Sequence, residues 1–369
     1  MFISLRHLIL AATVGLALLM PASVAIAAAP PGPRLAVVKL RDPQWTQLLT
    51  VDPLGETRES LYALSEANAP PAVYVWSAPS WSPDGTQIAF TVLNEMLPEF
   101  GSTGTSLALI SADGGAVKGI PDTANGFEPV FSPGGHTIAF ARQRESHIPN
   151  RRDADGRFEG VSVWLADLET GRSRPLTPWR DGVFLFPSSF SPDGSRLALS
   201  RRIGDNRPVA AEIDLDGNPL RVFARNAYEP VYSPDGRSVA FLRGPWKEVT
   251  RHHSGNGRLR LAAPFNDIFL IGSPGTRPRR VTHTKRAVEE APRWDPSGQR
   301  LAYTEWRPFD YGSQSISRQE AIGFGFGKAV RMINADGTCP TTVLSGLHSM
   351  HYAAAWQPGP GREAGRIAC

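Results

Sequence analysis

Residues 81–90 read Trp-Ser-Pro-Asp-Gly-Thr-Gln-Ile-Ala-Phe, and the chain returns to this pattern four more times and once in truncated form. The later full copies begin at Phe131, Phe190, Tyr232 and Trp294, and the truncated copy begins at Trp356. These aromatic residues follow one another at intervals of 50, 59, 42, 62 and 62 residues. A period in this range is typical of a propeller or another repeat array.

Each full copy predicts a β-hairpin. Within Ser82–Gly85 the proline fixes φ for a type I turn, the aspartate tolerates the bridge region, and the glycine supplies a left-handed residue. In Ile88–Phe90 the first and third residues would point to one face of the strand and the alanine to the other. The small residue that recurs on the second face indicates the close approach of a neighbouring sheet.

The five full copies resemble the TolB-like propeller repeat, also called the PD40 or WD40-like repeat, and the resemblance covers almost all of the chain after its N-terminal leader. It implies an all-β fold, a six-bladed β-propeller of four-stranded blades. It does not imply a function, because this fold is shared by binding proteins and enzymes. TolB also has an N-terminal α/β domain that this sequence lacks, so its role in the Tol–Pal system is not carried over.

The remaining strands predict how the ring closes. Residues 34–39, 46–51 and 58–64 predict three strands that have no Ser-Pro-Asp-Gly hairpin before them. Ala354–Trp356 predicts an inner strand with no strands after it. The simplest arrangement pairs them in one composite blade, which removes the open sheet edges that would invite aggregation. Five intact blades and one composite blade give six.

The first 27 residues predict a signal peptide. Arg6 and His7 precede the apolar run Leu8–Met20, and Ala25–Ala27 is a cleavage signature. The run is shorter than the roughly 20 residues of a membrane-spanning helix, and an uncleaved N-terminal anchor is the alternative. We therefore expect a periplasmic or secreted protein with no membrane span after cleavage, with the propeller over residues 34–360 and a C-terminal tail over residues 361–369.

The net charge limits the class of binding partner, and the two cysteines raise the question of a disulfide bond. The net charge of +4 and the pI near 9.2 are compatible with an acidic partner. They are far from the dense basic stripe of a nucleic-acid-binding protein. Export makes a disulfide between Cys339 and Cys369 chemically feasible. Two free thiols are the alternative, because the sequence does not give the distance between the two Cα atoms that a bridge requires.

The connectors between second and third strands are long and variable. They cover residues 92–105, 142–161, 201–207, 243–265 and 305–328, and in a propeller they lie on one face. Binding residues usually lie on such loops, and Arg and aromatic side chains anchor many interfaces. The alternative is that the aromatic residues pack on their own blade. The candidate partner-binding residues are Arg142, Arg144, His147, Arg152, Trp246, Arg251, His252, Trp306, Arg307 and Tyr311.

A second candidate group would surround the mouth of the central channel. It consists of Glu128, Glu229, Glu290 and His351, which lie at or near the starts of inner strands. They would bind a cation or a basic peptide, or else satisfy backbone N–H groups. Two histidine pairs, His252–His253 and His348 with His351, could hold a metal ion, but they lack a companion carboxylate pattern, so no metal site is assigned.

No catalytic residue is assigned either. The sequence has no Gly-x-Ser-x-Gly motif, and it ends where a peptidase domain of the prolyl oligopeptidase kind would begin. Two classes of function stay open. The first is a monomeric, cofactor-free binding propeller that docks a protein or peptide on its long-loop face. The second is a metal-dependent enzyme acting on uronic acids or other polysaccharides, since similar propellers include oligogalacturonate lyases.

Overall fold

The computed structural model describes most of the unit Gly32–Cys369, and its described elements are all β-strands. The described residues are 34–42, 45–56, 58–63, 78–94, 104–144, 160–204, 206–252, 258–272, 274–284, 287–306, 329–345 and 350–358. Within these ranges no helix has the length and hydropathy to cross a membrane.

Most strands fall into antiparallel sets of four. The first set is β4 (Ser80–Trp81), β5 (Gln87–Asn94), β6 (Gly104–Ser111) and β7 (Lys118–Gly119). The second is β8 (Gly126–Phe131), β9 (Thr137–Gln143), β10 (Val161–Asp167) and β11 (Arg172–Pro175). The third is β12 (Val183–Phe190), β13 (Arg196–Ile203), β14 (Val209–Asp214) and β15 (Arg221–Arg225). A parallel bridge between Val161 and Phe184 joins the second and third sets into one eight-stranded sheet.

Two further sets and a hairpin follow. The fourth set is β16 (Ala227–Tyr232), β17 (Val239–Arg243), β20 (Asp267–Ile271) and β21 (Arg279–Arg280). The two-stranded sheet of β18 (Trp246–His252) and β19 (Arg258–Pro264) comes between β17 and β20 in the chain. The fifth set is β22 (Val288–Trp294), β23 (Arg300–Trp306), β24 (Ala329–Asn334) and β25 (Thr341–Leu344). The long connector over residues 243–265 is therefore largely a hairpin, which the sequence analysis did not predict.

The composite sheet is confirmed. It contains β26 (Met350–Trp356), β1 (Leu35–Asp42), β2 (Trp45–Val51) and β3 (Arg58–Ala63), in that order. The C-terminal strand β26 pairs antiparallel with β1, with Val37 opposite Ala353. This pairing joins the two ends of the chain's strand-forming region within one sheet, as the sequence predicts.

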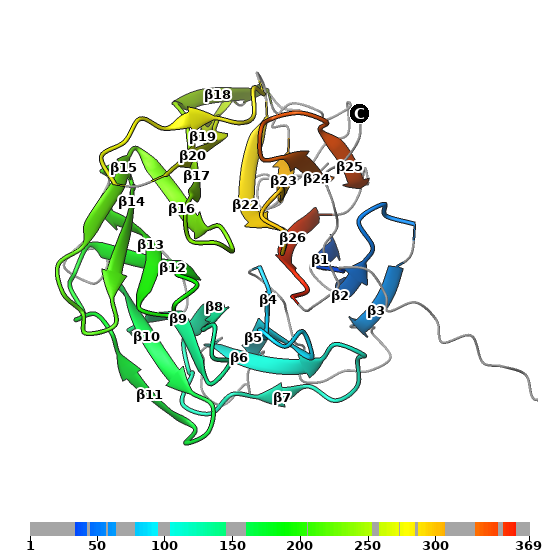
Figure 1. Ribbon diagram of the computed structural model, residues 1–369, viewed down its shortest axis with the longest axis vertical. Coiled ribbons are helices and arrows are strands. Elements are labelled where there is room, and N and C mark those ends of the chain that lie inside the picture. The colour runs from blue at the N-terminus through cyan, green and yellow to red at the C-terminus, as the bar shows by residue number, and fades with distance from the viewer. Residues whose placement is uncertain are drawn as a thin grey trace, which may run out of the picture. The chain divides into compact units, whose positions relative to one another are not determined.

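The sheets of this unit are arranged as in a propeller. In Figure 1 the strands β4, β8, β12, β16, β22 and β26 lie nearest the common centre. Each contacts the next in this order, and β26 contacts β4, so the inner strands form a closed cycle. This cycle is consistent with six blades, and the blade number stays a prediction.

The hairpin turns have the geometry that their sequence predicts. Gly85 is left-handed, with φ of 71°, and its N–H donates to the carbonyl of Ser82 at 2.9 Å. The Ser82 hydroxyl donates to Asp84 Oδ1 at 2.5 Å, and the N–H of Thr86 donates to the same oxygen at 3.0 Å. The hydrogen bond from the Ser82 hydroxyl, and to a smaller extent that from the Thr86 N–H, lower the pKa of Asp84. The aspartate therefore supports the turn mainly as a carboxylate.

Packing between sheets follows the predicted alternation. Ile88 and Phe90 are fully buried in a cluster that includes Val38 of β1, in the preceding sheet. Ala89, on the opposite face, packs in a different cluster with Phe140 of β9, in the following sheet. The recurrent alanine therefore allows the next sheet to approach closely.

Candidate functional site

The candidate site lies at one end of the strands of three consecutive sets. We call the end that carries the Ser-Pro-Asp-Gly turns the turn end, and the end from which the long connectors leave the loop end. The register places Arg201 opposite Val209, Val209 opposite Arg225, and Arg243 opposite Ala227, all at the loop end. Arg142 and Arg202 at this end stack on Trp164 and Phe184. Six further arginines at this end form what we call the arginine rim: Arg144, Arg180, Arg201, Arg207, Arg225 and Arg243.

The side chains of the arginine rim are accessible to solvent, and their positive charge is not neutralised by any described residue. Four of its side chains are exposed and two, Arg201 and Arg243, are half-buried. None of the six forms an ion pair with a described residue. Two carboxylates at the same end are already paired, Asp122 with Arg142 at 3.4 Å and Asp267 with Arg280. The rim therefore has positive charge available for a partner.

Arg142 was predicted to bind a partner, but its contacts lie within its own part of the fold. Its guanidinium carbon lies 4.3 Å from the centre of the Trp164 ring. Its Nε donates to the carbonyl of Ala124 at 2.9 Å, and the same side chain pairs with Asp122. These contacts favour a structural role for Arg142. They also hold the start of a connector in which Arg144, the last residue described before residue 160, is exposed.

The other predicted partner-binding residues are only partly described. Trp246, Arg251 and His252 lie in β18, and Trp306 ends β23, with backbone positions alone described. The remaining four, His147, Arg152, Arg307 and Tyr311, lie outside the described residues. The structure thus places Arg144 on the rim, and it leaves the roles of these other residues as predictions.

Two of the four predicted channel-mouth residues, Glu128 and Glu229, interact electrostatically in the structure. Glu128 and Glu229 occupy equivalent positions of β8 and β16, each before a proline and each left-handed, with φ of 55° and 49°. The carboxylate of Glu229 accepts the backbone N–H of Ala291 in the next inner strand at 2.6 Å. This bond favours the alternative that these glutamates satisfy backbone N–H groups.

Arg293 completes this group and was missed by the sequence reasoning. Burial raises the pKa of Glu128 to about 8, the nearby Glu229 adds to the rise, and Arg293 opposes it. Burial lowers the pKa of Arg293, against the effect of the two carboxylates. Arg293 directly precedes the repeat aromatic Trp294, a position that an alignment of the copies would have identified.

Arg293 also lines a cavity of about 280 Å³ at the turn end of the inner strands. Its wall includes Arg293 together with Ser80, Ser189 and repeat prolines such as Pro83. The Ser189 hydroxyl accepts the N–H of Tyr232, so it also links neighbouring inner strands. Of the other two predicted channel residues, Glu290 lies in β22, and His351 lies in β26 opposite Lys39, with only its backbone described.

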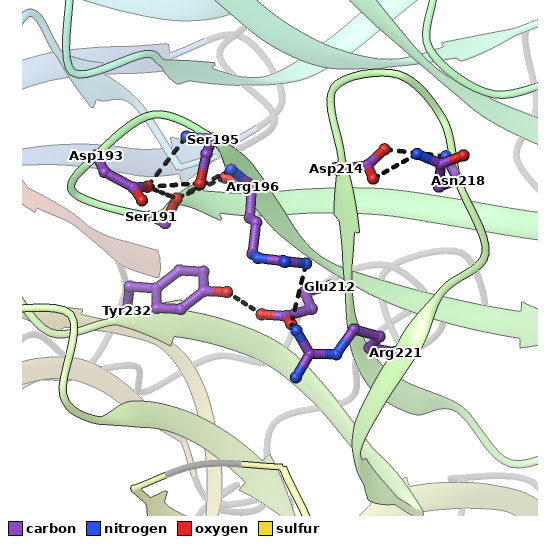
Figure 2. Close-up of polar contacts among 9 residues, drawn as sticks. All are labelled: Ser191, Asp193, Ser195, Arg196, Glu212, Asp214, Asn218, Arg221 and Tyr232. Carbon is purple, nitrogen blue, oxygen red and sulfur yellow. Dashed lines mark hydrogen bonds and ion pairs between the residues drawn. The ribbon is translucent and has the colours of Figure 1, made fainter.

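A second polar group, centred on the buried carboxylate of Glu212, links two sheets, as Figure 2 shows. Glu212, with 4% of its side chain exposed, lies 3.0 Å from Arg221 and 3.5 Å from Arg196. The Tyr232 hydroxyl, from the following inner strand, donates to the same carboxylate. Burial raises the pKa of Tyr232, and the bond to Glu212 raises it further. A buried charge needs such partners, which indicates that this group stabilises the junction between the sheets.

In the described ranges no group of three or more His, Cys, Asp or Glu side chains is placed to hold a metal ion. Cys339 is disulfide-bonded. The chain's other cysteine, Cys369, lies outside the described residues, and the pairing of the two stays a prediction.

Comparisons with known proteins agree with this architecture. No protein-family model matches the chain. Among solved structures, the chain is similar to TolB from Acinetobacter baumannii, with a TM-score of 0.59, 17% identity, and coverage of 89% of this chain and 67% of that one. It is similar to a putative TolB from Agrobacterium tumefaciens, with a TM-score of 0.56, 16% identity, and coverage of 89% and 99%. The fold is a β-propeller.

The chain is also similar to a third solved structure and to one curated protein. A chain of a nidogen/laminin complex has a TM-score of 0.53 at 12% identity, with coverage of 88% of this chain and 97% of that one. Among curated proteins, the uncharacterized peptidase YuxL of Bacillus subtilis is 24% identical over 197 residues, which cover 48% of this chain and 26% of the relative. The chain thus matches about a quarter of that relative's length. At these identities the solved structures show the fold alone.

Proposed function

We propose that this propeller is a non-enzymatic binding protein of the cell envelope, or a secreted one, that docks an acidic segment of a protein partner on its loop end. The observation that carries the proposal is the arginine rim, six arginines at one end of three consecutive sets with no described acidic partner. Guanidinium groups bind carboxylates through two parallel hydrogen bonds. A glutamate- or aspartate-rich segment is the ligand that this arrangement fits best.

The opposite end supports the same assignment. The turn aspartates Asp84, Asp193 and Asp235 each accept the hydroxyl of the serine two residues before them. Their charges are committed to turn geometry, whereas the rim charges are not. Like charges on one surface raise the local potential and speed the arrival of an oppositely charged partner. The TolB-like architecture supports a binding role, and the predicted signal peptide supports the location. No feature of the described residues favours the polysaccharide enzyme, which stays a prediction.

A labelled 20-residue oligoglutamate peptide provides a direct test. The variant Arg144→Glu/Arg207→Glu/Arg225→Glu reverses three exposed rim charges. A matched control, Arg172→Glu/Arg174→Glu/Arg237→Glu, reverses three exposed arginines at the turn end and changes the net charge equally. Binding would be followed by fluorescence anisotropy at 50 and 200 mM salt.

We expect the rim variant to bind at least tenfold more weakly and to lose most of the salt dependence, because exposed charges are screened over about 10 Å at 0.1 M salt. The control should bind within about threefold of wild type. Equal losses in both variants would show that only the net charge matters, and undiminished binding by the rim variant would place the site elsewhere.

A further inference from the structure

The hairpin β18–β19 continues the two central strands of its blade. In the β17–β20 ladder Val239 faces Ile271 and Arg243 faces Asp267. In the β18–β19 ladder Trp246 faces Pro264 and His252 faces Arg258. Both ladders have the same register, and between them the N–H of Phe265 donates to the carbonyl of Pro245 at 3.0 Å. The two ladders therefore keep one register across a short gap at residues 244–245 and 265–266, which this hydrogen bond bridges.

The flanking strands do not continue along this extension. The pairing of β16 with β17 ends at Ala227 and Arg243, and β21 pairs with Phe269 and Leu270 alone. Among the described strands, neither β18 nor β19 has a third strand beside it. Seven residue pairs at about 3.4 Å each extend the ribbon roughly 24 Å past the blade, from the loop end. Figure 1 shows the ribbon beyond the β16–β17–β20–β21 sheet.

The junction is built for close backbone contact. At Gly244 a Cβ atom would lie 2.0 Å from the carbonyl oxygen of Phe265 and 2.5 Å from the Cα of Asn266. Only glycine fits at such a distance. The ribbon thus leaves the blade through a position that no other residue can occupy without moving the opposite strand.

Two physical features indicate what the ribbon binds. Its edges present backbone N–H and C=O groups that can pair with another extended chain, and a two-stranded ribbon alone is only marginally stable in water. Its sequence contains four basic residues, Lys247, Arg251, Arg258 and Arg260, and one acidic residue, Glu248. Its base is Arg243, a member of the arginine rim. A third strand of acidic sequence would pair with the backbone N–H and C=O groups of the ribbon edge and would neutralise its positive charge.

We propose that β18–β19 is a docking arm to which an extended acidic segment of the partner adds as a third strand. Main-chain hydrogen bonds to the ribbon edge supply affinity, and glutamate or aspartate side chains on the added strand meet the basic residues of the ribbon. This inference rests on the proposed function, because it specifies how the acidic segment is held.

The continuous register allows a ribbon-less variant to be designed. Replacing residues 246–264 with Asn-Gly makes Pro245 and Phe265 the outer residues of a two-residue hairpin turn. The hydrogen bond from Phe265 N–H to the Pro245 carbonyl is the one that such a turn requires. The β17–β20 pairing can therefore stay unchanged, and the thermal unfolding midpoint of the variant reports whether the blade is intact.

The probe is a labelled twelve-residue peptide of alternating Glu and Thr, compared with the same sequence N-methylated at every backbone amide. The methylated peptide keeps its charge but cannot pair with a strand edge. On the full chain we expect the unmethylated peptide to bind at least tenfold more tightly. We also expect it to slow hydrogen exchange at amides within residues 246–252 or 258–264 at least tenfold. The ribbon-less variant should bind both peptides equally weakly.

Three results would overturn the proposal. They are equal affinity for the two peptides on the full chain, full affinity of the ribbon-less variant for the unmethylated peptide, and protection of the ribbon amides by a second copy of the chain, seen as concentration-dependent dimerisation without peptide. The exchange measurement needs no variant, so a ribbon-less chain that fails to fold leaves the test intact. If the ribbon-less variant still binds oligoglutamate and rim reversal abolishes that binding, the proposed function holds while the docking arm does not.

Discussion

Replacing the buried Glu289 with glutamine should make the protein less stable than wild type at low pH and more stable than wild type at high pH. Glu289 has no exposed surface. Its carboxyl accepts hydrogen bonds from the Thr282 hydroxyl at 2.6 Å, the Thr284 hydroxyl at 3.0 Å and the N–H of Ile268 at 3.1 Å. Burial nevertheless raises its pKa from 4.5 to about 8. The hydroxyl bonds oppose that rise, and the nearby carboxylates of Asp267 and Glu305 add to it.

The sign and size of the effect follow from linkage. Between pH 4.5 and about 8 the folded carboxyl keeps its proton while the unfolded carboxyl loses it. The stability that Glu289 contributes is therefore fully present below about pH 4.5 and is lost as the pH rises through about 8. At about 1.4 kcal/mol for each pH unit, the loss is on the order of 5 kcal/mol, most of it between pH 5 and 9.

Glu289→Gln removes this titration and keeps nearly the same shape. At pH 5 the variant should be less stable than wild type by about 1 kcal/mol, because its amide group reproduces the hydroxyl bonds imperfectly. At pH 9 it should be the more stable protein. Glu128, whose pKa is also about 8, adds a second share of pH dependence that the substitution leaves in place.

Urea unfolding followed by tryptophan fluorescence at pH 5, 7 and 9 would measure the change in the free energy of unfolding. Glu56→Gln, at an exposed turn residue, is the control and should give the wild-type pH profile. Parallel profiles for Glu289→Gln and wild type would refute the reasoning, since they would mean that Glu289 titrates alike in the folded and unfolded chain.

Four further outcomes are expected. Tyr232→Phe should lower the free energy of unfolding by about 1–3 kcal/mol, because Glu212 loses a buried donor. Tyr228→Phe should be nearly neutral by the same urea assay, because the Tyr228 hydroxyl is buried and has no hydrogen-bond partner among the described residues. A chain lacking residues 34–64 should aggregate or stay unfolded, because β26 loses its partner strand; a soluble product that unfolds cooperatively would contradict the closure. N-terminal sequencing of the mature protein should begin near Ala28, and an intact Met1 on a soluble cytoplasmic species would contradict export.

The fold was predictable because its signals are local. Proline and glycine restrict φ within a few residues, so each Ser-Pro-Asp-Gly copy predicts its own hairpin, and the structure has left-handed glycines at Gly85, Gly194 and Gly236. The small residue at Ala89 predicted the close approach of a neighbouring sheet on that face, and the structure shows that it is the following sheet. Strands at the two ends that each lacked a partner predicted the composite sheet, because unpaired edges are unfavourable.

Which polar side chains lie close together is determined by the tertiary structure alone. Glu128, Glu229 and Arg293 come from three different blades, and only the closed cycle of inner strands brings their charges together. Tyr232 reaches Glu212 across a junction between sheets for the same reason. The arginine rim likewise depends on which strand ends the ring places side by side. Turn geometry is set by the backbone preferences of neighbouring residues, whereas the distance between two charges depends on every turn and pairing between them.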